Sequence, residues 1–223
     1  MTIQESQKKA EELCRTCRYL YGGKGQKYTK SLVYKLAKQY PTKYTKAITE
    51  EALRDADRGF LAIDCSGFVC RVLGIEDAGS TQLKLKAVKT YAVKRASAKP
   101  GMVLYKPGHV AYIGEDLNVY EMRSTKADSC ISKFEDRAPA FTNMLIIKGS
   151  PLEYQEKGIE LYPQINYIGF SIVAALQKAG ETDTSKAHRT RIAAKNGIFD
   201  YTGSAAQNLK MVKLLKEGKL KKC

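Results

Sequence analysis

Two stretches, FLAIDCSGFVCRVLGI at residues 60–75 and PGMVLYKPGHVAYIG at residues 100–114, decide the fold class of this chain. In the first, Asp64 and Ser66 favour a helix start. Apolar residues then recur at helical spacing: Phe68, Val69, Val72 and Leu73. In the second, a Pro-Gly turn precedes short β-rich runs. Helices followed by consecutive strands predict an α+β domain with an antiparallel sheet.

The flanking sequence extends this pattern in both directions. Helical periodicity predicts helices at residues 4–18, 31–40 and 45–58. Short apolar runs predict strands at residues 102–106, 109–114, 117–124 and 143–149. After the basic stretch 84–99 the pattern changes from helices to strands.

The composition changes near residue 150, which predicts two domains. Residues 1–150 form the predicted α+β domain. Residues 151–165 are predicted to form a linker, because they contain proline and glycine residues, which are typical of loops. Three helical stretches follow within residues 166–223 and predict a small three-helix domain.

The charge of the chain points to an anionic partner. Its 223 residues carry a formal net charge of +15, which attracts polyanions. Nucleic acid and the anionic polymers of a bacterial wall are both candidates, and the sign of the charge does not choose between them. A basic surface with no charged partner is the third interpretation.

The sequence predicts neither membrane insertion nor a metal site. No apolar run approaches the roughly 20 residues of a membrane span, and the start MTIQESQKKAEELCRTC has no apolar stretch typical of a signal peptide. We therefore expect synthesis in a cytoplasm without a signal peptide. Cys14 and Cys17 form a CxxC motif, but no second pair completes a zinc site. We expect these two cysteines to pack within the fold.

Cys65 and His109 are the predicted nucleophile and base. A thiolate is favoured at a helix N-terminus and beside an imidazolium, and the free N–H groups of a helix start can hold an oxyanion. Cys65 occupies such a helix start. The chain has only two histidines. His188 lies among charges in KAHRTR and is predicted to be a surface residue, whereas His109 opens an apolar strand.

Glu121 is predicted to orient His109. A hairpin turn centred on Glu115 would place residue 109 directly opposite residue 121, and opposed residues share one face of a sheet. A carboxylate within the run VYEMR is explained by this pairing, because buried carboxylates are rarely unpaired. A Glu121 that faces solvent is the alternative.

These residues resemble a known group of enzymes. The segment Tyr19-Leu20-Tyr21-Gly22-Gly23, DCSGFV at 64–69 and the stretch 100–114 together look like the signature of the NlpC-type and CHAP-type cysteine peptidases, which are papain-like cell-wall hydrolases. The resemblance spans roughly residues 10–148. A tryptophan common in the first of these segments is missing here.

The resemblance implies a papain-like catalytic domain that needs no metal or cofactor. It assigns Cys65 as nucleophile, His109 as base and Glu121 as the third, more variable polar residue. It further suggests that Tyr21, with Asp64 and Ser66 beside the nucleophile, shapes the oxyanion and substrate site. Members of the group cleave amide bonds in peptidoglycan stem peptides or the bond joining the peptide to the sugar.

The end of the chain resembles a second module. SIVAALQKAG at 171–180 and RTRIAAKNGIFDYTGSAAQNLKMVKLLKEGKL at 189–220 are similar to a helical module at the C-terminus of phage lysins, which implies wall binding. The candidate wall-binding residues are Arg191, Asn196, Tyr201 and Gln207. A helical bundle that only forms a homodimer is the alternative.

The sequence therefore predicts an endolysin-like peptidoglycan hydrolase, either a cysteine endopeptidase or an N-acetylmuramoyl-L-alanine amidase, that acts on the cell wall after release from the cell. A phage or a bacterial origin fits equally. Two alternatives remain open: a cysteine amidase or acyltransferase of the same fold acting on another substrate, and a basic, non-enzymatic nucleic-acid binder. For the peptidoglycan hydrolase we expect no nucleic-acid partner.

Overall fold

The computed structural model describes residues 1–223, except for the side chain of Cys130. The chain forms two compact units, one of residues Ile3–Glu153 and one of residues Tyr154–Cys223 together with Met1–Thr2. The segment expected as a linker begins with a helix, α7 (Pro151–Glu156). Among the described residues, no helix combines the length and apolar character that a bilayer crossing requires.

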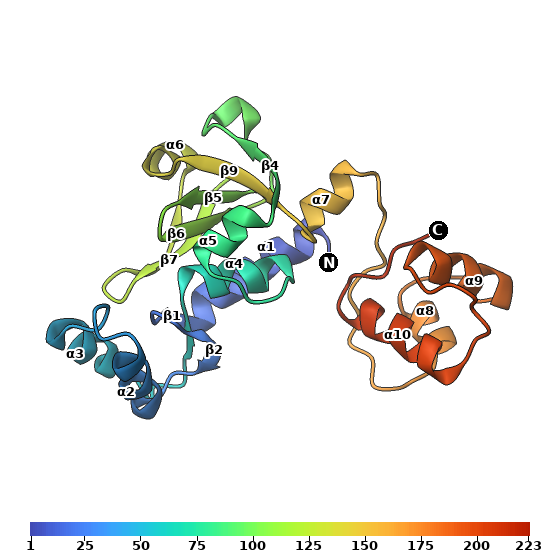
Figure 1. Ribbon diagram of the computed structural model, residues 1–223, viewed down its shortest axis with the longest axis horizontal. Coiled ribbons are helices and arrows are strands. Elements are labelled where there is room, and N and C mark those ends of the chain that lie inside the picture. Colours follow the sequence, from blue (N-terminus) through green and yellow to red (C-terminus); the bar gives the residue numbers. More distant parts are fainter. The chain divides into compact units, whose positions relative to one another are not determined.

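The larger unit is a mixed α+β fold built on a six-stranded antiparallel sheet with the strand order β4-β9-β5-β6-β7-β8 (Figure 1). Its strands are β4 (Ala87–Tyr91), β5 (Val103–Lys106), β6 (His109–Ile113), β7 (Val119–Ser124), β8 (Asp128–Ser132) and β9 (Asn143–Ile147). The fold class predicted from the sequence is thus confirmed at the level of an α+β architecture with antiparallel pairing.

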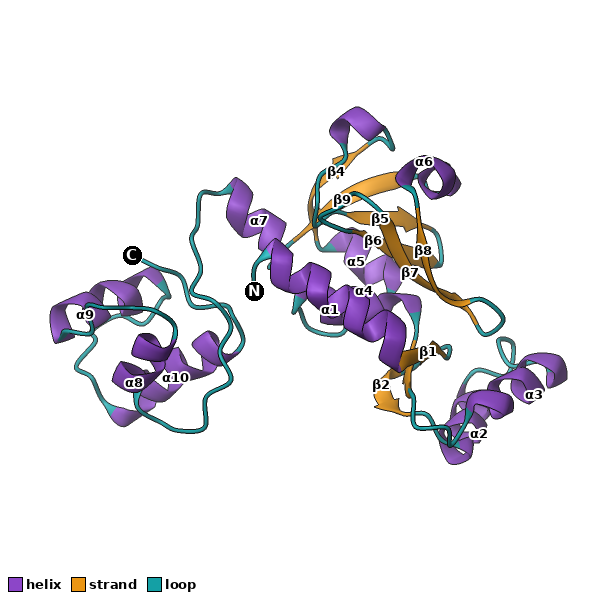
Figure 2. Cartoon of the chain, turned by 180° about the vertical axis from the view of Figure 1, so that it is seen from behind, coloured by secondary structure: helices purple, strands orange, loops and turns teal.

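Helices α1 (Ile3–Thr16), α4 (Cys65–Leu73) and α5 (Ser80–Leu85) pack on one face of this sheet (Figures 1 and 2). α4 is buried along nearly its whole length, because its apolar residues meet α1 on one side and β6 on the other. The opposite face of the sheet has its own core around Phe134 and Phe141, which belong to the segment that includes α6 (Phe134–Arg137) and the 3-10 turn Ala138–Ala140.

A second, three-stranded sheet joins the start of the chain to the start of α4. Its strands are β1 (Cys17–Tyr19), β2 (Lys24–Lys27) and β3 (Leu61–Ile63), in the order β1-β3-β2. β1 runs parallel to β3, so the residues after Tyr19 and the residues after Ile63 emerge at the same edge. The Asp64 amide donates to the Gly23 carbonyl at 2.9 Å, which ties the two segments together.

Two further helices, α2 (Lys30–Gln39) and α3 (Lys46–Asp55), lie next to this small sheet (Figure 1). They enclose a separate core with Leu20 and Tyr28. Thr29 and Thr45 cap their N-termini through side-chain hydrogen bonds.

The smaller unit contains three main helices, α8 (Ile172–Lys178), α9 (Lys186–Lys195) and α10 (Ala205–Lys216) (Figure 2). Serine side chains cap all three N-termini: Ser171, Ser185 and Ser204. Their apolar faces meet in one core that also includes Tyr162 and Leu220. This small core is separate from those of the larger unit.

Candidate active site

Cys65 is the first residue of α4, and Asp64 forms the N-cap. One oxygen of the Asp64 carboxylate, Oδ1, accepts from the Gly67 amide at 2.7 Å and from the Ser66 hydroxyl at 2.8 Å. This cap is the reason that the helix begins at the cysteine. The first amides of a helix have no acceptor within it, so Cys65 lies where backbone N–H groups are free to bind an anion.

A cleft of about 440 Å³ opens at Cys65. Its walls come from the turn after β1 and the first residue of β2, the segment after α2, the start of α4, the start of α5 and the turn before β6. Among the lining residues are Tyr21, Lys24, Tyr40, Lys43, Ser66 and Gly108. Cys65 itself is only 7% exposed, so the cleft is its route to solvent.

Asp64 and Ser66 are engaged with each other and with Lys24. The Lys24 ammonium donates to both Asp64 oxygens, at 2.9 and 3.0 Å, and to the Ser66 hydroxyl at 2.9 Å. The Gly22 amide also donates to Asp64, at 3.2 Å. The two residues predicted to shape the site thus hold the turn after β1 against the start of the helix. Lys24 was not predicted as part of the site, because the residues near it in sequence do not indicate an ion pair with Asp64.

Tyr21 lines the cleft, with its ring edge-on to Tyr40 at 5.3 Å and the Lys43 ammonium 5.6 Å from its centre. Tyr19 is the tyrosine whose ionisation is coupled to Cys65. Burial raises the pKa of Tyr19, and the negative charges of Cys65 and Asp64 raise it further. Tyr21 was the one tyrosine of the quoted motif that was predicted to shape the site, and Tyr19, the last residue of β1, was not predicted.

His109 is the first residue of β6, and its ring is fixed by two contacts. Its Nε2 lies 2.7 Å from Oε2 of Glu121, and the ring stacks on Phe141 with 5.7 Å between the centroids. An ionised carboxylate only accepts hydrogen bonds, so Nε2 carries the proton. In a neutral imidazole the lone pair is then on Nδ1, and no described residue forms a hydrogen bond with that nitrogen. The geometry thus assigns Nδ1 as the basic nitrogen.

The turn before His109 fixes where β6 starts. Pro107 and Gly108 form the two-residue connection between β5 and β6, since Lys106 pairs with His109. Gly108 has a φ of 80°, a left-handed conformation that a proline-glycine turn of type II requires. A Cβ atom at Gly108 would meet no atom within 4 Å. Glycine is therefore favoured here by the positive φ of the backbone and not by steric crowding.

The predicted hairpin register is wrong by two residues. Tyr112 pairs with Tyr120 and Ile113 with Val119, so the turn is centred on Asp116 and not on Glu115. Leu117 adopts a φ of 60° in this turn, which a sequence reading does not anticipate for leucine. In a strand pair a shift of two residues preserves the face. His109 and Glu121 therefore contact each other as diagonal neighbours and not as an opposed pair.

Glu121 is fully buried and is held by two arginines as well as by His109. Arg137 binds both carboxylate oxygens, through Nε to Oε1 and through Nη2 to Oε2 at 2.9 Å. Arg123 donates to Oε1 from Nη2 at 2.9 Å and from Nε at 3.2 Å. Burial alone would raise the pKa of Glu121, but the hydrogen bonds from His109, Arg137 and Arg123 hold it well below its ordinary range. Sequence analysis identified neither arginine as part of the site.

Cys65 lies near the start of β6, the strand that His109 opens. The backbone N–H of Val110 lowers the pKa of the Cys65 thiol, and both residues belong to the same buried core, so the sulfur lies near the residue that follows the histidine. No hydrogen bond joins Sγ of Cys65 to the His109 ring in the described structure. Burial and the Asp64 carboxylate raise the pKa of the Cys65 thiol to about 11, against the opposing effects of the Val110 and Ser66 amides and of Lys24.

Comparison of the chain with protein-family models, with curated proteins and with solved structures found no match.

The remaining cysteines and the acidic residues assemble no metal centre among the described side chains: no group of three or more His, Cys, Asp or Glu residues could hold an ion. Cys17 is buried in the main core, and Cys14 packs beside it.

In the smaller unit, three of the four candidate wall-binding residues serve the unit itself. Asn196 bonds to the backbone of Lys221, donating to its carbonyl and accepting from its amide. Gln207 completes a capping box with Ser204. Tyr201 is buried and hydrogen-bonds to other side chains.

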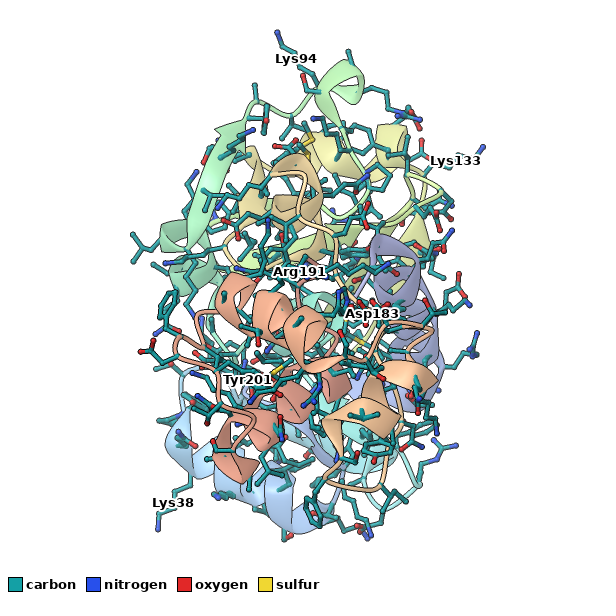
Figure 3. The ribbon with its side chains drawn as sticks, turned by 90° about the vertical axis from the view of Figure 1, so that its right-hand side faces the viewer. Lys38, Lys94, Lys133, Asp183, Arg191 and Tyr201 are labelled. Carbon is teal, nitrogen blue, oxygen red and sulfur yellow. The ribbon has the colours of Figure 1, made fainter. Side chains whose placement is uncertain are left out.

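Arg191, the fourth candidate, is 60% exposed and lies 3.8 Å from Asp183 on the same side of the unit (Figure 3). His188, predicted as a surface residue, is only 13% exposed and lies 3.1 Å from Glu181. That prediction is wrong because Glu181 and Tyr162 lie against Nε2 of His188, at 3.1 and 3.5 Å, and Tyr162 is 26 residues away in sequence.

Proposed function

We propose that this protein is a papain-like cysteine hydrolase that cleaves an amide bond of bacterial peptidoglycan. One observation carries the proposal: a cysteine at a capped helix start opens into a cleft, beside a strand whose first residue is a histidine oriented by a buried carboxylate. Nucleophile, base and orienting group are the three parts that covalent acyl transfer needs.

The proposed reaction has two half-reactions. Nδ1 of His109 takes the proton from the Cys65 thiol as the sulfur attacks the carbonyl carbon of the substrate amide. The tetrahedral intermediate then expels the amine, which receives the proton from His109, and leaves a thioester on Cys65. Water, deprotonated by His109, hydrolyses the thioester and releases the carboxylic acid and the free thiol.

Two groups are suited to stabilise the oxyanion. The Cys65 amide is at the helix start, where it has no intrahelical acceptor. The Tyr19 hydroxyl is the second candidate, because Tyr19 packs against the core that contains Cys65 and a phenol is a hydrogen-bond donor at neutral pH. Tyr21, at the cleft wall, contacts substrate in this scheme instead of the oxyanion.

The charge of the cleft fits an acidic peptide. Lys24 and Asp64 neutralise each other, whereas Lys43 contacts only the Tyr21 ring among the interactions described for it. The unbalanced charge at the cleft is thus positive. Stem peptides of peptidoglycan carry free carboxylates, and the resemblance to wall hydrolases points to the same substrate class.

The smaller unit is proposed to bind the wall through a groove of about 320 Å³ on α10 and the segment before α8. Phe170, which is 80% exposed, lines this groove together with Leu209. Lys213 and Lys216 also line it, and neither has an acidic partner in the described structure. An exposed aromatic ring can stack on sugars, and the ammonium groups suit carboxylates.

Digestion of purified walls tests the function. Mass spectrometry of the released muropeptides should show new free amines and no new reducing sugar ends, with wild-type protein and with Cys14→Ser but not with Cys65→Ala. Products with new reducing ends would identify a glycosidase. Release of nothing from the walls of several species, by a protein that hydrolyses other amides, would favour a non-wall substrate.

A further inference from the structure

A small helical lobe of the larger unit supplies part of the wall of the cleft at Cys65. This lobe consists of α2 and α3, which lie between β2 and β3 in the chain, and the turn after α2 places Tyr40 and Lys43 in the lining of the cleft. Pro41 is the second residue of this turn, and the Lys43 amide donates to the Tyr40 carbonyl at 2.9 Å. Proline favours a β-turn at this position, so the turn holds Lys43 at a defined place beside Tyr40.

The turn after α2 is held against the segment after β1. The hydroxyl of Tyr44, which is buried, donates to the Tyr21 carbonyl at 2.7 Å. The Tyr40 ring lies edge-on to the Tyr21 ring and also packs on Gly22, whose φ is 79° and where a Cβ atom would come within 2.9 Å of the Tyr40 ring. Both the backbone and the close approach therefore require glycine at this position. Because a hydrogen bond and ring packing join the two segments, this part of the cleft wall is formed before substrate binds.

The wall presents one ammonium group beside two aromatic rings. The Lys43 ammonium lies 5.6 Å from the centre of the Tyr21 ring, and no acidic side chain pairs with it in the described structure. Among the described residues that line the cleft, Asp64 is the only acidic one, and it already forms an ion pair with Lys24. The charge that a ligand in this cleft meets without a counter-ion is thus that of Lys43.

From this arrangement we infer that Tyr21, Tyr40 and Lys43 form a specificity subsite that binds a free carboxylate of the substrate. The inference rests on the proposed function in taking a peptide of peptidoglycan as that substrate. The ammonium pairs with the carboxylate, and the rings pack on the aliphatic atoms next to it. Since the subsite lines the same cleft as Cys65, the carboxylate belongs to a residue near the cleaved bond. A peptide in which this carboxylate is amidated offers Lys43 no charge and is a poorer substrate.

Two forms of one soluble muropeptide test the inference, one with its glutamate carboxylate free and one with that carboxylate amidated. Wild-type protein should cleave the free acid with a kcat/KM about fivefold higher, mainly through a lower KM, since an exposed ion pair contributes a factor of this order. The preference should decrease as salt is added, because the side chain of Lys43 is exposed and its charge is screened.

Variants at Lys43 separate charge from shape. Lys43→Met removes the charge and keeps a long side chain, so the ratio of the two kcat/KM values should fall to about one. Lys43→Arg should retain the preference, and Lys43→Glu should reverse it. Tyr40→Leu removes a ring but no charge, so both muropeptides should bind more weakly while the preference remains.

Lys38→Met is the matched control for these variants. Lys38 lies in the last turn of α2, on the same lobe, but it projects outward and does not line the cleft (Figure 3). The fivefold preference for the free acid should therefore be unchanged in Lys38→Met. A loss of preference in this control equal to that in Lys43→Met would show that only the total charge of the lobe matters, and would overturn the assignment to Lys43.

Binding to Cys65→Ala protein separates this inference from the proposed hydrolysis, because binding needs no cleavage. Isothermal titration calorimetry should give a Kd about fivefold lower for the free acid than for the amide, and Lys43→Met in the same background should abolish the difference. If wild-type protein cleaves neither muropeptide but Cys65→Ala shows this preference, the hydrolysis is wrong and the subsite stands. Equal affinities, no binding of either muropeptide, or a preference that Lys43→Met retains would overturn the inference.

Discussion

Glu121 couples the proposed chemistry to the stability of the larger unit, because one buried carboxylate orients the base and pairs with two arginines. His109 contributes one hydrogen bond to this cluster, and its proposed role is proton transfer. Replacing His109 should therefore affect mainly activity, whereas replacing Glu121 should affect both activity and stability.

His109→Ala should lower kcat/KM by about a thousandfold with little change in melting temperature, since general acid–base groups contribute factors of this order. Glu121→Gln should lower kcat/KM less, but should cost about 3 kcal/mol of unfolding free energy because Arg137 loses its anionic partner. Steady-state kinetics and thermal denaturation measure both effects. Equal stability of the two variants would contradict the buried ion-pair cluster.

The depressed pKa of Glu121 also predicts how stability depends on pH. An acid whose folded-state pKa lies below its unfolded value stabilises the fold at pH values above the unfolded pKa, and this contribution disappears as the pH falls toward the folded value. The unfolding free energy should thus decline below about pH 4.3. Denaturant titrations of wild type and Glu121→Gln across this range should show a smaller decline in the variant.

Tyr19 has a matched control in Tyr28. Both phenols are buried, but Tyr28 lies in the core of α2 and α3, and its hydroxyl has no hydrogen-bond partner among the described residues. If Tyr19 donates to the oxyanion, Tyr19→Phe should reduce kcat on the order of 100-fold with a small effect on KM. Tyr28→Phe should leave kcat unchanged. A Tyr19→Phe variant with wild-type kcat would remove this residue from the proposed mechanism.

At the scale of elements, the start of α4 is the feature that positions the nucleophile. Its N-cap was predictable, since DCS before an apolar periodic run is a helix-start signature. The ion pair of Asp64 with Lys24 was not, because it joins residues 40 apart in sequence. The effects of the cap and of the ion pair on stability and on the pKa of the Cys65 thiol can be separated by substitutions at Asp64.

Asp64→Asn should preserve the helix cap and lose the charge, whereas Asp64→Ala should lose both. We expect Asp64→Ala to cost about 1 kcal/mol more than Asp64→Asn in unfolding free energy. Both variants should lower the pKa of the Cys65 thiol, because the Asp64 carboxylate raises it. Thermal melts and thiolate titration check the two effects independently.

The sheet shows where sequence patterns succeed and where they fail. The central strands β5, β6, β7 and β9 carry apolar runs and were predicted. The edge strands β4 and β8 were not, since the middle residues of β4 are exposed and edge strands leave no apolar pattern. The hairpin register depended on a leucine with positive φ, yet the alternation of faces was enough to place His109 and Glu121 together.

At the scale of the whole molecule, positive charge is spread over the surface. Lys38, Lys94 and Lys133 all project outward from the larger unit (Figure 3), and the smaller unit is basic as well. Charge alone can thus attract the protein to an anionic wall. Specific binding by the smaller unit must be distinguished from this general attraction.

The Phe170 groove offers that distinction. In a Cys65→Ala background, Phe170→Ala should weaken sedimentation with purified walls about tenfold in Kd, and the difference should persist at moderate salt because aromatic stacking is not screened. Phe199→Ala is the control, since Phe199 is 73% exposed but does not line the groove. Equal wall binding by the two variants would show that the wall-binding site does not include the groove at Phe170. A loss of self-association in Phe170→Ala, with wall binding unchanged, would favour a role in dimerisation.

The central claim is that Cys65 forms a covalent acyl intermediate with a peptidoglycan fragment. Intact-protein mass spectrometry after acid quenching during turnover of soluble muropeptides tests it most directly. Wild-type protein should carry an adduct equal in mass to the acyl half of the cleaved muropeptide, located on the peptide containing Cys65, and folded Cys65→Ala should carry none and release no product. Muropeptide cleavage by folded Cys65→Ala, at a rate above background and without an adduct, would contradict the account.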